Sequence, residues 1–414
     1  MIILAIESSC DETAAAVLKD GELLSNVVVS QVDIFKAYGG VIPEVAARSH
    51  LEAILPVIDK ALEDAKVTWN DITHIAVTHT PGLLGSLLIG TLTARTLAIL
   101  HNKPLYAVHH LKSHIYSNWL TNDMVASGET VPSLSAYGGY DRVTASATPA
   151  TAGGRDLRPT KRAVDRKRAK TPQFPLLALV ISGGHTQIVY MKEHNSFEII
   201  GTTLDDAVGE CFDKVAKILG LPYPGGPSIA HAAEKGDENK YRFPHPNVEG
   251  LNFSFSGLKT AVLRAVQKEA GVGIDYPSHD LKKLLNPEQI ADFAASFQKT
   301  AIAILLEKLQ LALEQHPDVK SVVFAGGVSA NKALRKEASE FGVLSDSADS
   351  FHIASEFSQA QKYAFNGLPI YFPPIEFSGD NAAMVAMAAF YEIQAGIKPS
   401  DPYNLTLAPR SILC

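Results

Sequence analysis

The chain has 414 residues, of which 46% are hydrophobic and 20% are charged, a composition typical of a soluble globular protein with about two domains. Its net charge of −7 excludes a protein that binds nucleic acid over its whole surface. Residues 141–170 nevertheless hold nine Lys or Arg and three Asp, a local charge of +6.

The cysteines Cys10, Cys211 and Cys414 argue against a disulfide framework, because their number is odd and no CxxC pair is present. This usage fits the reducing cytoplasm, where we expect the protein. No apolar run is long enough to span a bilayer, so we expect no membrane association. The apolar run after Met1 lacks a basic start and ends at Glu7, which favours a strand over a signal peptide.

Residues 1–31 predict three strands separated by a polar turn and an Asp-Gly turn. The polar turn contains Glu7, Ser9 and Glu12 among other carboxylates and hydroxyls. Such groups can hold a metal-bound phosphate or orient a nucleophile, although a solvated loop is their commoner role. Apolar periodicity then predicts helices over 43–62 and 81–100, and strands over 72–78 and 104–108.

Two histidines follow the last of these strands. His110 and His114 are four residues apart, so on a helix they share one face and can bind one divalent metal. The alternative is a pair of surface or capping histidines. A zinc peptidase is poorly supported, because Leu111 stands where the HExxH motif requires glutamate.

Periodicity is lost over residues 122–173, which are rich in Ser, Thr, Ala, Gly, Pro and Arg. We expect a flexible basic insertion between two folded halves. Its basic end could contact an RNA backbone, although a solvated loop is the simpler interpretation. A second, smaller insertion is expected over 346–367.

The segment LLALVISGGHTQIVY, residues 176–190, predicts a β-hairpin with Ser182, Gly183 and Gly184 in its turn. Glycines there can take positive φ and direct backbone N–H groups at an anion. The side chains of Ser182 and His185 add donors at the same point. A plain tight turn is an equally good interpretation of this motif alone.

After the hairpin, a strand over 197–203 and a helix over 205–219 are predicted. Three acidic residues at i, i+4 and i+7 predict one stripe along the helix: Asp206, Glu210 and Asp213. Such a stripe is usually a solvated face. This one leads into a Pro-Gly-Gly-Pro loop that contains Gly226, so it is also a candidate wall of a cleft.

A second glycine turn follows a strand predicted over 319–324. The turn contains Asn331 and leads into a helix, an arrangement that can cradle a nucleotide but is a weak signal alone. Asp380 precedes the last predicted helix, 382–392, and can add an oxygen ligand to the two histidines.

Both halves therefore predict three strands followed by helices, with glycine turns at corresponding places. Two such halves around a central cleft describe an α/β fold of the duplicated ribonuclease-H-like, actin-like (ASKHA) type. The expected N-terminal lobe spans 1–121 and is completed by a helix at about 377–395. The second lobe is expected over 174–376, and a C-terminal tail over 396–414.

Several motifs in one order resemble a known family. They read AIESSCDET, SQVDIFKAYGGVIPEVAARSHLE, THTPGLLGSLLIG, HHLKSH, VISGGHTQIV, GECFDKVAKILGLPYPGGP, FSFSGLKT, AGGVSANKALR and GDNAAMVA. They are similar to motifs of the bacterial tRNA adenosine threonylcarbamoyltransferases, the TsaD/Kae/Qri family, once labelled glycoproteases. The resemblance covers nearly all of the chain outside the two insertions.

The resemblance implies transfer of threonylcarbamoyl from threonylcarbamoyl-AMP to N6 of adenosine 37, 3′ of the anticodon, in tRNAs that read ANN codons. One divalent metal, Fe(II) first and Zn(II) second, would be bound by His110, His114 and Asp380. The catalytic motif would contribute Glu12 and Ser9. The ligand would be bound by Ile181, Ser182, Gly183, Gly184 and His185, with Asp213, Gly226 and Asn331 on its adenosine.

The family also implies partners besides tRNA: a smaller paralogous TsaB-like subunit, a TsaE-like P-loop ATPase and a synthase that makes the adenylate. A homodimer is a further possibility. The chain departs from the family pattern at Ser113, within HxxxH, and at Ser378 and Gly379, before Asp380. Three alternatives stay open: an ATP-dependent kinase or ATPase of the same fold, a non-catalytic scaffold subunit, and a metallopeptidase.

Overall fold

The computed structural model describes residues 1–120, 171–341, 343–344, 367–410 and 413. The predicted insertions at 122–173 and 346–367 lie almost entirely outside the described residues, and the predicted domain boundaries stay predictions. Among the described helices, none combines the length and apolarity needed to cross a membrane.

The first sheet has five strands in the order β3-β2-β1-β4-β5. Their bounds are Ile2–Glu7 (β1), Glu12–Lys19 (β2), Glu22–Ser30 (β3), His74–Thr80 (β4) and Leu105–His109 (β5). β1 pairs antiparallel with β2 and parallel with β4. The predicted hairpins are confirmed, and Asp20 and Gly21 both have positive φ in the β2–β3 turn, as a tight hairpin requires.

The second sheet has six strands in the order β10-β11-β9-β6-β7-β8. Their bounds are Leu176–Ile181 (β6), Thr186–Met191 (β7), Glu198–Thr202 (β8), Ser321–Ala325 (β9), Val343–Leu344 (β10) and Pro369–Tyr371 (β11). The series β8-β7-β6-β9-β11 repeats β3-β2-β1-β4-β5, with two antiparallel pairings and then two parallel ones. This duplication confirms the predicted actin-like fold class.

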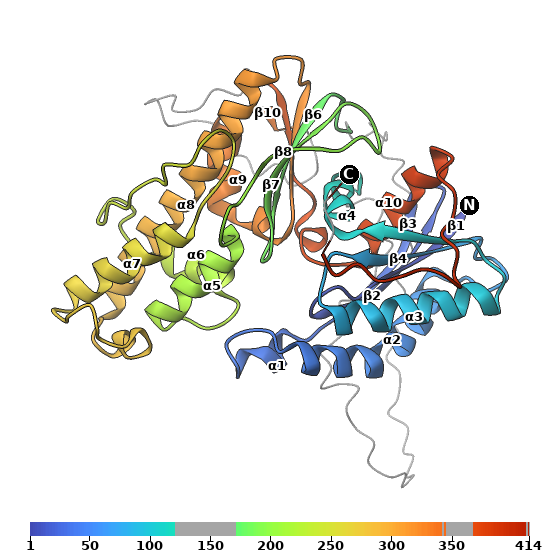
Figure 1. Ribbon diagram of the computed structural model, residues 1–414, viewed down its shortest axis with the longest axis horizontal. Helices are drawn as coiled ribbons and strands as arrows, with labels where there is room; N and C mark the ends of the chain where they lie inside the picture. The colour runs from blue at the N-terminus through green and yellow to red at the C-terminus, as the bar shows by residue number, and fades with distance from the viewer. Residues whose placement is uncertain (121–170, 342, 345–366, 411–412, 414) are drawn as a thin grey trace, which may run out of the picture.

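Helices cover the outer faces of both sheets (Figure 1). Their bounds are Val32–Lys36 (α1), Pro43–Ala65 (α2), Leu84–Leu100 (α3), His110–Tyr116 (α4), Val208–Leu219 (α5), Gly225–Ala233 (α6), Ser256–Glu269 (α7), Pro287–Gln315 (α8), Lys332–Phe341 (α9) and Ala382–Gln394 (α10). α2 and α3 pack on the first sheet, whereas α5, α7 and α8 pack beside the second.

Two helices lie between the sheets. α10 packs on β1, β2 and β3 of the first sheet, and α4 contacts α10 as well as β6 and β9 of the second. One hydrophobic core joins all of these elements and includes residues of both sheets. α4, which contains two of the predicted metal ligands, and α10, which follows the third, are therefore held in the interior of the molecule.

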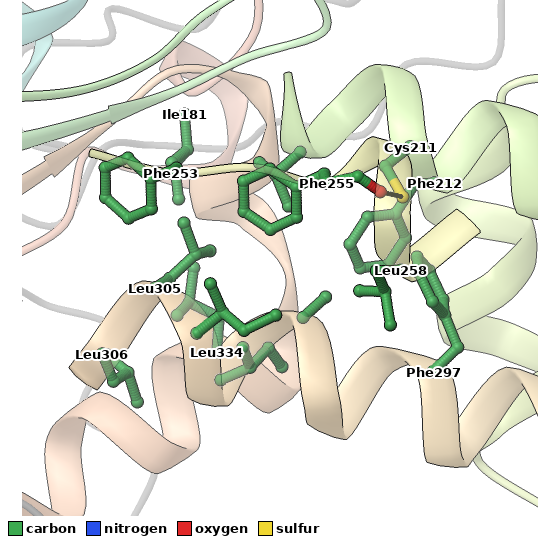
Figure 2. Packing of buried hydrophobic residues seen from close by; sticks show 14 of the residues in the cluster. Ile181, Cys211, Phe212, Phe253, Phe255, Leu258, Phe297, Leu305, Leu306 and Leu334 are labelled. Atoms are coloured by element: carbon green, nitrogen blue, oxygen red, sulfur yellow. Dashed lines mark hydrogen bonds between the residues drawn. The ribbon is translucent and has the colours of Figure 1, made fainter. Parts of the chain in front are cut away.

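The core of the second half supports the hairpin and α5. Figure 2 shows Ile181 at the end of β6 packed with Phe253, Phe255 and Leu305, and the Cys211 thiol donates a hydrogen bond to the carbonyl of Phe255. Each fully buried side chain of this size contributes about 1.5–3 kcal/mol. The turn after β6 therefore projects from a rigid base.

Candidate metal and substrate site

The three predicted metal ligands come together. His110 and His114 lie on α4, and Asp380 immediately precedes Asn381, the N-cap of α10. Oδ1 of Asp380 lies 3.5 Å from Nε2 of His110 and 3.1 Å from Nε2 of His114. One ligand atom from each residue lies within 4.8 Å of the other two, so the predicted trio is brought into one cluster.

The chemistry of this cluster fits a divalent metal. Both imidazoles are buried, and neither ring nitrogen of His114 makes a hydrogen bond within the described part of the chain. Buried polar atoms without hydrogen bonds are costly, whereas metal coordination would satisfy Nε2. Two imidazoles and one carboxylate suit both Zn(II) and Fe(II), with coordination positions left for substrate.

Glu7, the last residue of β1, completes the cluster. From the sequence, it was named only as one of several polar groups after the first strand and was not placed beside a metal ligand. Its Oε2 lies 3.2 Å from Nδ1 of His110. It accepts further hydrogen bonds from the backbone N–H of Ser9 and the hydroxyl of Thr78, each at 2.6 Å. The signal that could have revealed it is a carboxylate at the end of an apolar strand, since buried charges are rare unless paired.

Burial and the charges within the cluster shift the pKa values of its side chains. Burial would raise the pKa of Asp380, but His110 and His114 lower it to about 2. Burial would lower the pKa of His110, but Asp380 and Glu7 raise it to about 9. Burial, together with the two neighbouring histidines, lowers the pKa of His185 to about 4. The hairpin turn therefore places a neutral imidazole beside the metal ligands.

Of the two predicted catalytic residues, Ser9 lies in the turn after β1 and Glu12 is the first residue of β2. The Ser9 hydroxyl lies 3.2 Å from Nδ1 of His110, and Glu12 accepts a hydrogen bond of 3.1 Å from Ser30. Burial raises the pKa of Glu12 well above its ordinary value, and the charges of Asp11 and Asp380 raise it further. Both residues thus stand near the metal cluster, and their catalytic roles stay predictions.

Two hydrogen bonds between Ser182 and His185 close the hairpin turn after β6. The Ser182 N–H donates to the His185 carbonyl at 2.8 Å, and the Ser182 hydroxyl accepts from the His185 N–H at 3.2 Å. Gly183 and Gly184 do not use the positive φ that glycine permits, because neither lies in the left-handed region. No atom lies within 4 Å of a Cβ built on either glycine, so they leave this face open to a ligand.

Two other elements touch this turn through glycines. A Cβ on Gly209, in α5, would lie 2.5 Å from the carbonyl oxygen of Ser182. A Cβ on Gly326, which has φ of +86° after β9, would lie 2.5 Å from the carbonyl oxygen of Ile181. The Ile181 side chain packs in the core, so only its backbone can reach a ligand. These contacts join α5 and the second glycine turn to the hairpin.

The residues predicted on the adenosine lie beyond that turn. Asp213 accepts a hydrogen bond of 2.6 Å from the N–H of Gly225, and burial raises the pKa of its carboxyl. Asn331 caps α9 and donates to Gln298 at 2.8 Å, so both ends of its amide are engaged. A Cβ on Gly226 would meet open space. Adenosine binding by these residues stays a prediction.

A pocket of about 130 Å³ lies beside Asp213. It is lined by Gly39, from the segment after α1, and by residues around α5 and α6, among them Tyr223 and Lys217. Gly39 is the lining residue from the first half of the chain, and the others come from the second half, so the pocket lies where the two halves meet.

Comparison with known proteins identifies the family. The family model for tRNA N6-adenosine threonylcarbamoyltransferase (TsaD) matches residues 22–139 and 162–387. The chain belongs to this family. A curated relative of that name from Bacillus subtilis (strain 168) is 41% identical and covers 98% of this chain and 94% of its own length. Another, from Symbiobacterium thermophilum, is 42% identical and covers 96% and 93%.

Membership of the TsaD family confirms the resemblance and favours a transferase over the kinase, scaffold and peptidase alternatives. The curated relatives are named for one activity, and this chain matches them over nearly its whole length. Presence of all three predicted ligands in one cluster is also the opposite of what a scaffold subunit without a metal site would show.

The prediction of one acidic stripe along α5 is wrong. α5 begins at Val208, so Asp206 lies before it, where the hydroxyl of Thr203 donates to the Asp206 carbonyl. Lys214 pairs with Asp206 at 2.7 Å and with Glu210 at 2.9 Å. Asp213 instead accepts its hydrogen bond from Gly225, at the start of α6.

Two interactions that hold the site together were not predicted from the sequence. Arg335 donates to the carbonyls of Ser329 and Pro373 at 2.8 and 2.7 Å, which ties the second glycine turn to the segment before Asp380. Lys112 on α4 and Glu392 on α10 form a buried ion pair at 2.7 Å. Loss of one partner would leave a buried charge unpaired, so this pair fixes α4, which carries the two histidines, against α10, which follows Asp380.

Proposed function

We propose that this chain transfers the threonylcarbamoyl group of threonylcarbamoyl-AMP to N6 of the adenosine 3′ of the anticodon in ANN-reading tRNAs, which yields t6A and AMP. The observation that carries this proposal is the cluster of His110, His114 and Asp380, whose ligand atoms lie within 4.8 Å beside an open glycine turn. The substrate tRNA places the proposed reaction in the cytoplasm.

In the proposed reaction, N6 forms a bond to the carbamoyl carbon, the bond from that carbon to the phosphate oxygen breaks, and N6 loses a proton. His110, His114 and Asp380 would hold the metal, which supplies a Lewis acid when bound. We propose Fe(II) first and Zn(II) second, because two histidines and one carboxylate are typical of non-haem Fe(II) sites.

This chain's own residues supply the other parts of the proposed chemistry. Backbone N–H groups of the turn at Gly183 and Gly184 can stabilise negative charge that develops on the ligand. Glu12, whose pKa is raised by burial, is the candidate acceptor for the N6 proton, since a carboxylate with a raised pKa is a stronger base. We propose that Ser9 orients the metal-site histidine that it contacts.

The test is mass spectrometry of t6A in tRNA from cells depleted of the endogenous enzyme and complemented with variants of this chain. Wild type should restore t6A, and the double variant His110→Ala, His114→Ala should not. The matched control is His231→Ala, His279→Ala, since these side chains are 78% and 74% exposed and lie on the surface. Normal t6A in the His110, His114 double variant would refute the proposal.

We also propose that a smaller paralogous subunit docks on α2 and α3, and that a P-loop ATPase joins that assembly, as the family resemblance implies. Exposed leucines follow i, i+4 spacing on both helices: Leu51 and Leu55 on α2, and Leu84, Leu88 and Leu92 on α3. A Cβ on Gly85 would lie 3.0 Å from that of Ala47, so the helices approach closely here. Large exposed apolar patches commonly mark interaction sites.

Leu55→Asp and Leu88→Asp are each expected to abolish co-purification with the paralogous subunit, because a charge would be buried at the interface. The control is Leu204→Asp, since Leu204 is 62% exposed in the second half of the chain. Retention of the subunit by both variants would contradict the proposal. Self-association of the isolated chain that these variants abolish would instead assign the patch to a second copy.

A further inference from the structure

We propose that Glu7 is a positioning residue that selects the metal-binding tautomer of His110. The inference rests on the proposed metal site and deepens it. It concerns a residue outside the three ligands, at the end of a different element, β1.

Glu7 is held so that it can act only as a hydrogen-bond acceptor. Its side chain is fully buried at the end of β1. The Ser9 N–H reaches Oε1, and the Thr78 hydroxyl reaches Oε2, both at 2.6 Å. An ionised carboxylate has no proton to donate, and two donors already fix its plane. The remaining neighbour of Oε2 is Nδ1 of His110, at 3.2 Å.

This contact determines which nitrogen of His110 keeps its proton when the ring is neutral, as a metal ligand must be. Because Oε2 accepts, Nδ1 must donate, and the neutral ring then presents the lone pair of Nε2. Nε2 is the nitrogen that faces Asp380, at 3.5 Å. A carboxylate on the far nitrogen of a metal-bound histidine fixes both its tautomer and its ring orientation.

The second histidine has no such support. Nδ1 of His114 is buried and makes no hydrogen bond within the residues that the structure describes. Its ring is held instead by packing, since it is completely buried, and it lies edge-on to His110 with centroids 4.6 Å apart. Orientation of the pair by hydrogen bonding therefore depends on Glu7 and its neighbour Ser9.

Glu7→Gln is the informative change, because it keeps the size of the side chain but replaces one acceptor oxygen by an NH₂ donor. If the amide oxygen keeps the N–H of Ser9, the NH₂ group faces Nδ1 of His110. Nδ1 must then accept, and the proton moves to Nε2, where it blocks the metal. Loss of a residue that hydrogen-bonds to a metal-bound histidine typically lowers metal affinity about 10–100-fold.

The experiment titrates the metal-free full-length chain with Co(II) and follows the ligand-field absorption. Glu7→Gln should bind Co(II) about 10–100-fold more weakly than wild type. The matched control is Thr78→Val, which removes a hydrogen bond to the same oxygen but leaves the acceptor for His110, and it should show a clearly smaller loss. Thermal unfolding of each variant reports whether it folds.

A second measurement needs no variant: ¹⁵N NMR of histidine-labelled wild type with Zn(II). The expected spectrum shows His110 protonated at Nδ1 and metal-bound at Nε2. Metal bound through Nδ1, or Co(II) affinity of Glu7→Gln equal to that of wild type, would overturn the inference and leave the metal site itself standing. Wild type that binds neither metal would instead end the proposed metal site, and the inference with it.

Discussion

Replacement of Asp380 by asparagine is expected to abolish stable metal binding and, with it, formation of t6A. Asp380 is the one anion among the three proposed ligands, and its Oδ1 faces Nε2 of both histidines. Its pKa of about 2 keeps the carboxylate ionised throughout the neutral range. An asparagine amide is uncharged, and its NH₂ group cannot coordinate a metal. The variant therefore loses the negative charge and one of the two carboxylate oxygens that could act as a ligand.

The expected loss of metal affinity is larger than the loss caused by changing a residue that only hydrogen-bonds to a metal ligand. Removal of a group that only orients a ligand costs about 10–100-fold in metal affinity, and Asp380→Asn changes a ligand itself. We expect metal to be lost on dialysis and t6A to fall to background in the complementation experiment.

Elemental analysis after dialysis is the direct measurement for Asp380→Asn. The matched control is Glu376→Gln, an exposed carboxylate that precedes Asp380 on the same connection. This control should retain metal and t6A at the level of wild type. Stoichiometric metal in Asp380→Asn would mean that the carboxylate is not a ligand.

Gly209→Ala is expected to destabilise the protein and to weaken binding of threonylcarbamoyl-AMP. The added Cβ would lie 2.5 Å from the carbonyl oxygen of Ser182 and 2.8 Å from Cα of Gly183, and both are backbone atoms. A flexible side chain could move aside, but this turn is closed by two hydrogen bonds between Ser182 and His185. The turn or the start of α5 must therefore shift.

Such overpacking typically costs about 1–3 kcal/mol of stability. This cost opposes the gain of about 0.5–1 kcal/mol that alanine usually brings over glycine within a helix. Because the displaced atoms belong to the proposed ligand turn, we also expect KM for the adenylate to rise.

Gly257→Ala is a closely matched control. Gly209 and Gly257 are each the second residue of their helices, α5 and α7, but a Cβ on Gly257 would meet no atom within 4 Å. Gly257→Ala should keep or slightly raise stability and leave KM unchanged. If thermal unfolding and KM were the same for the two variants, the close contact of α5 with the turn would have no energetic consequence.

Patterns within short segments predicted much of this fold. Alternating and continuous apolar runs predicted the strands of the first sheet and β6 to β9 of the second, because side chains on a strand alternate between faces. The short strands β10 and β11 were not predicted. The four-residue spacing of His110 and His114 predicted that both lie on one helical face, as α4 shows. These predictions succeeded because the physical cause lies within a few residues along the chain.

Other features depend on contacts between distant segments. The start of α5 moves to Val208 because Asp205 accepts hydrogen bonds from the segment at Ser254 and Ser256. The turn at Gly183 and Gly184 needs no positive φ, because its glycines serve to leave space rather than to bend the chain. Neither cause is visible in the local pattern.

The site residues that the sequence did not reveal also depend on contacts between distant segments. Glu7 closes an apolar strand, and only the fold reveals that His110 lies next to it. Arg335 is one of many arginines until the carbonyls of Ser329 and Pro373 are seen around it. For Asp380, the residues alone indicated a plausible ligand, and the meeting with two histidines from another helix required the three-dimensional structure.

The place of α10 has a consequence for synthesis of the protein on the ribosome. The first sheet is complete once β5 ends at His109, but the helix that covers its inner face begins only at Ala382. At about 5–20 residues per second, that apolar face stays bare for roughly 14–55 s in each nascent chain. A nascent chain stalled in this interval would present an uncovered sheet face, which is a binding site for chaperones and a route to aggregation.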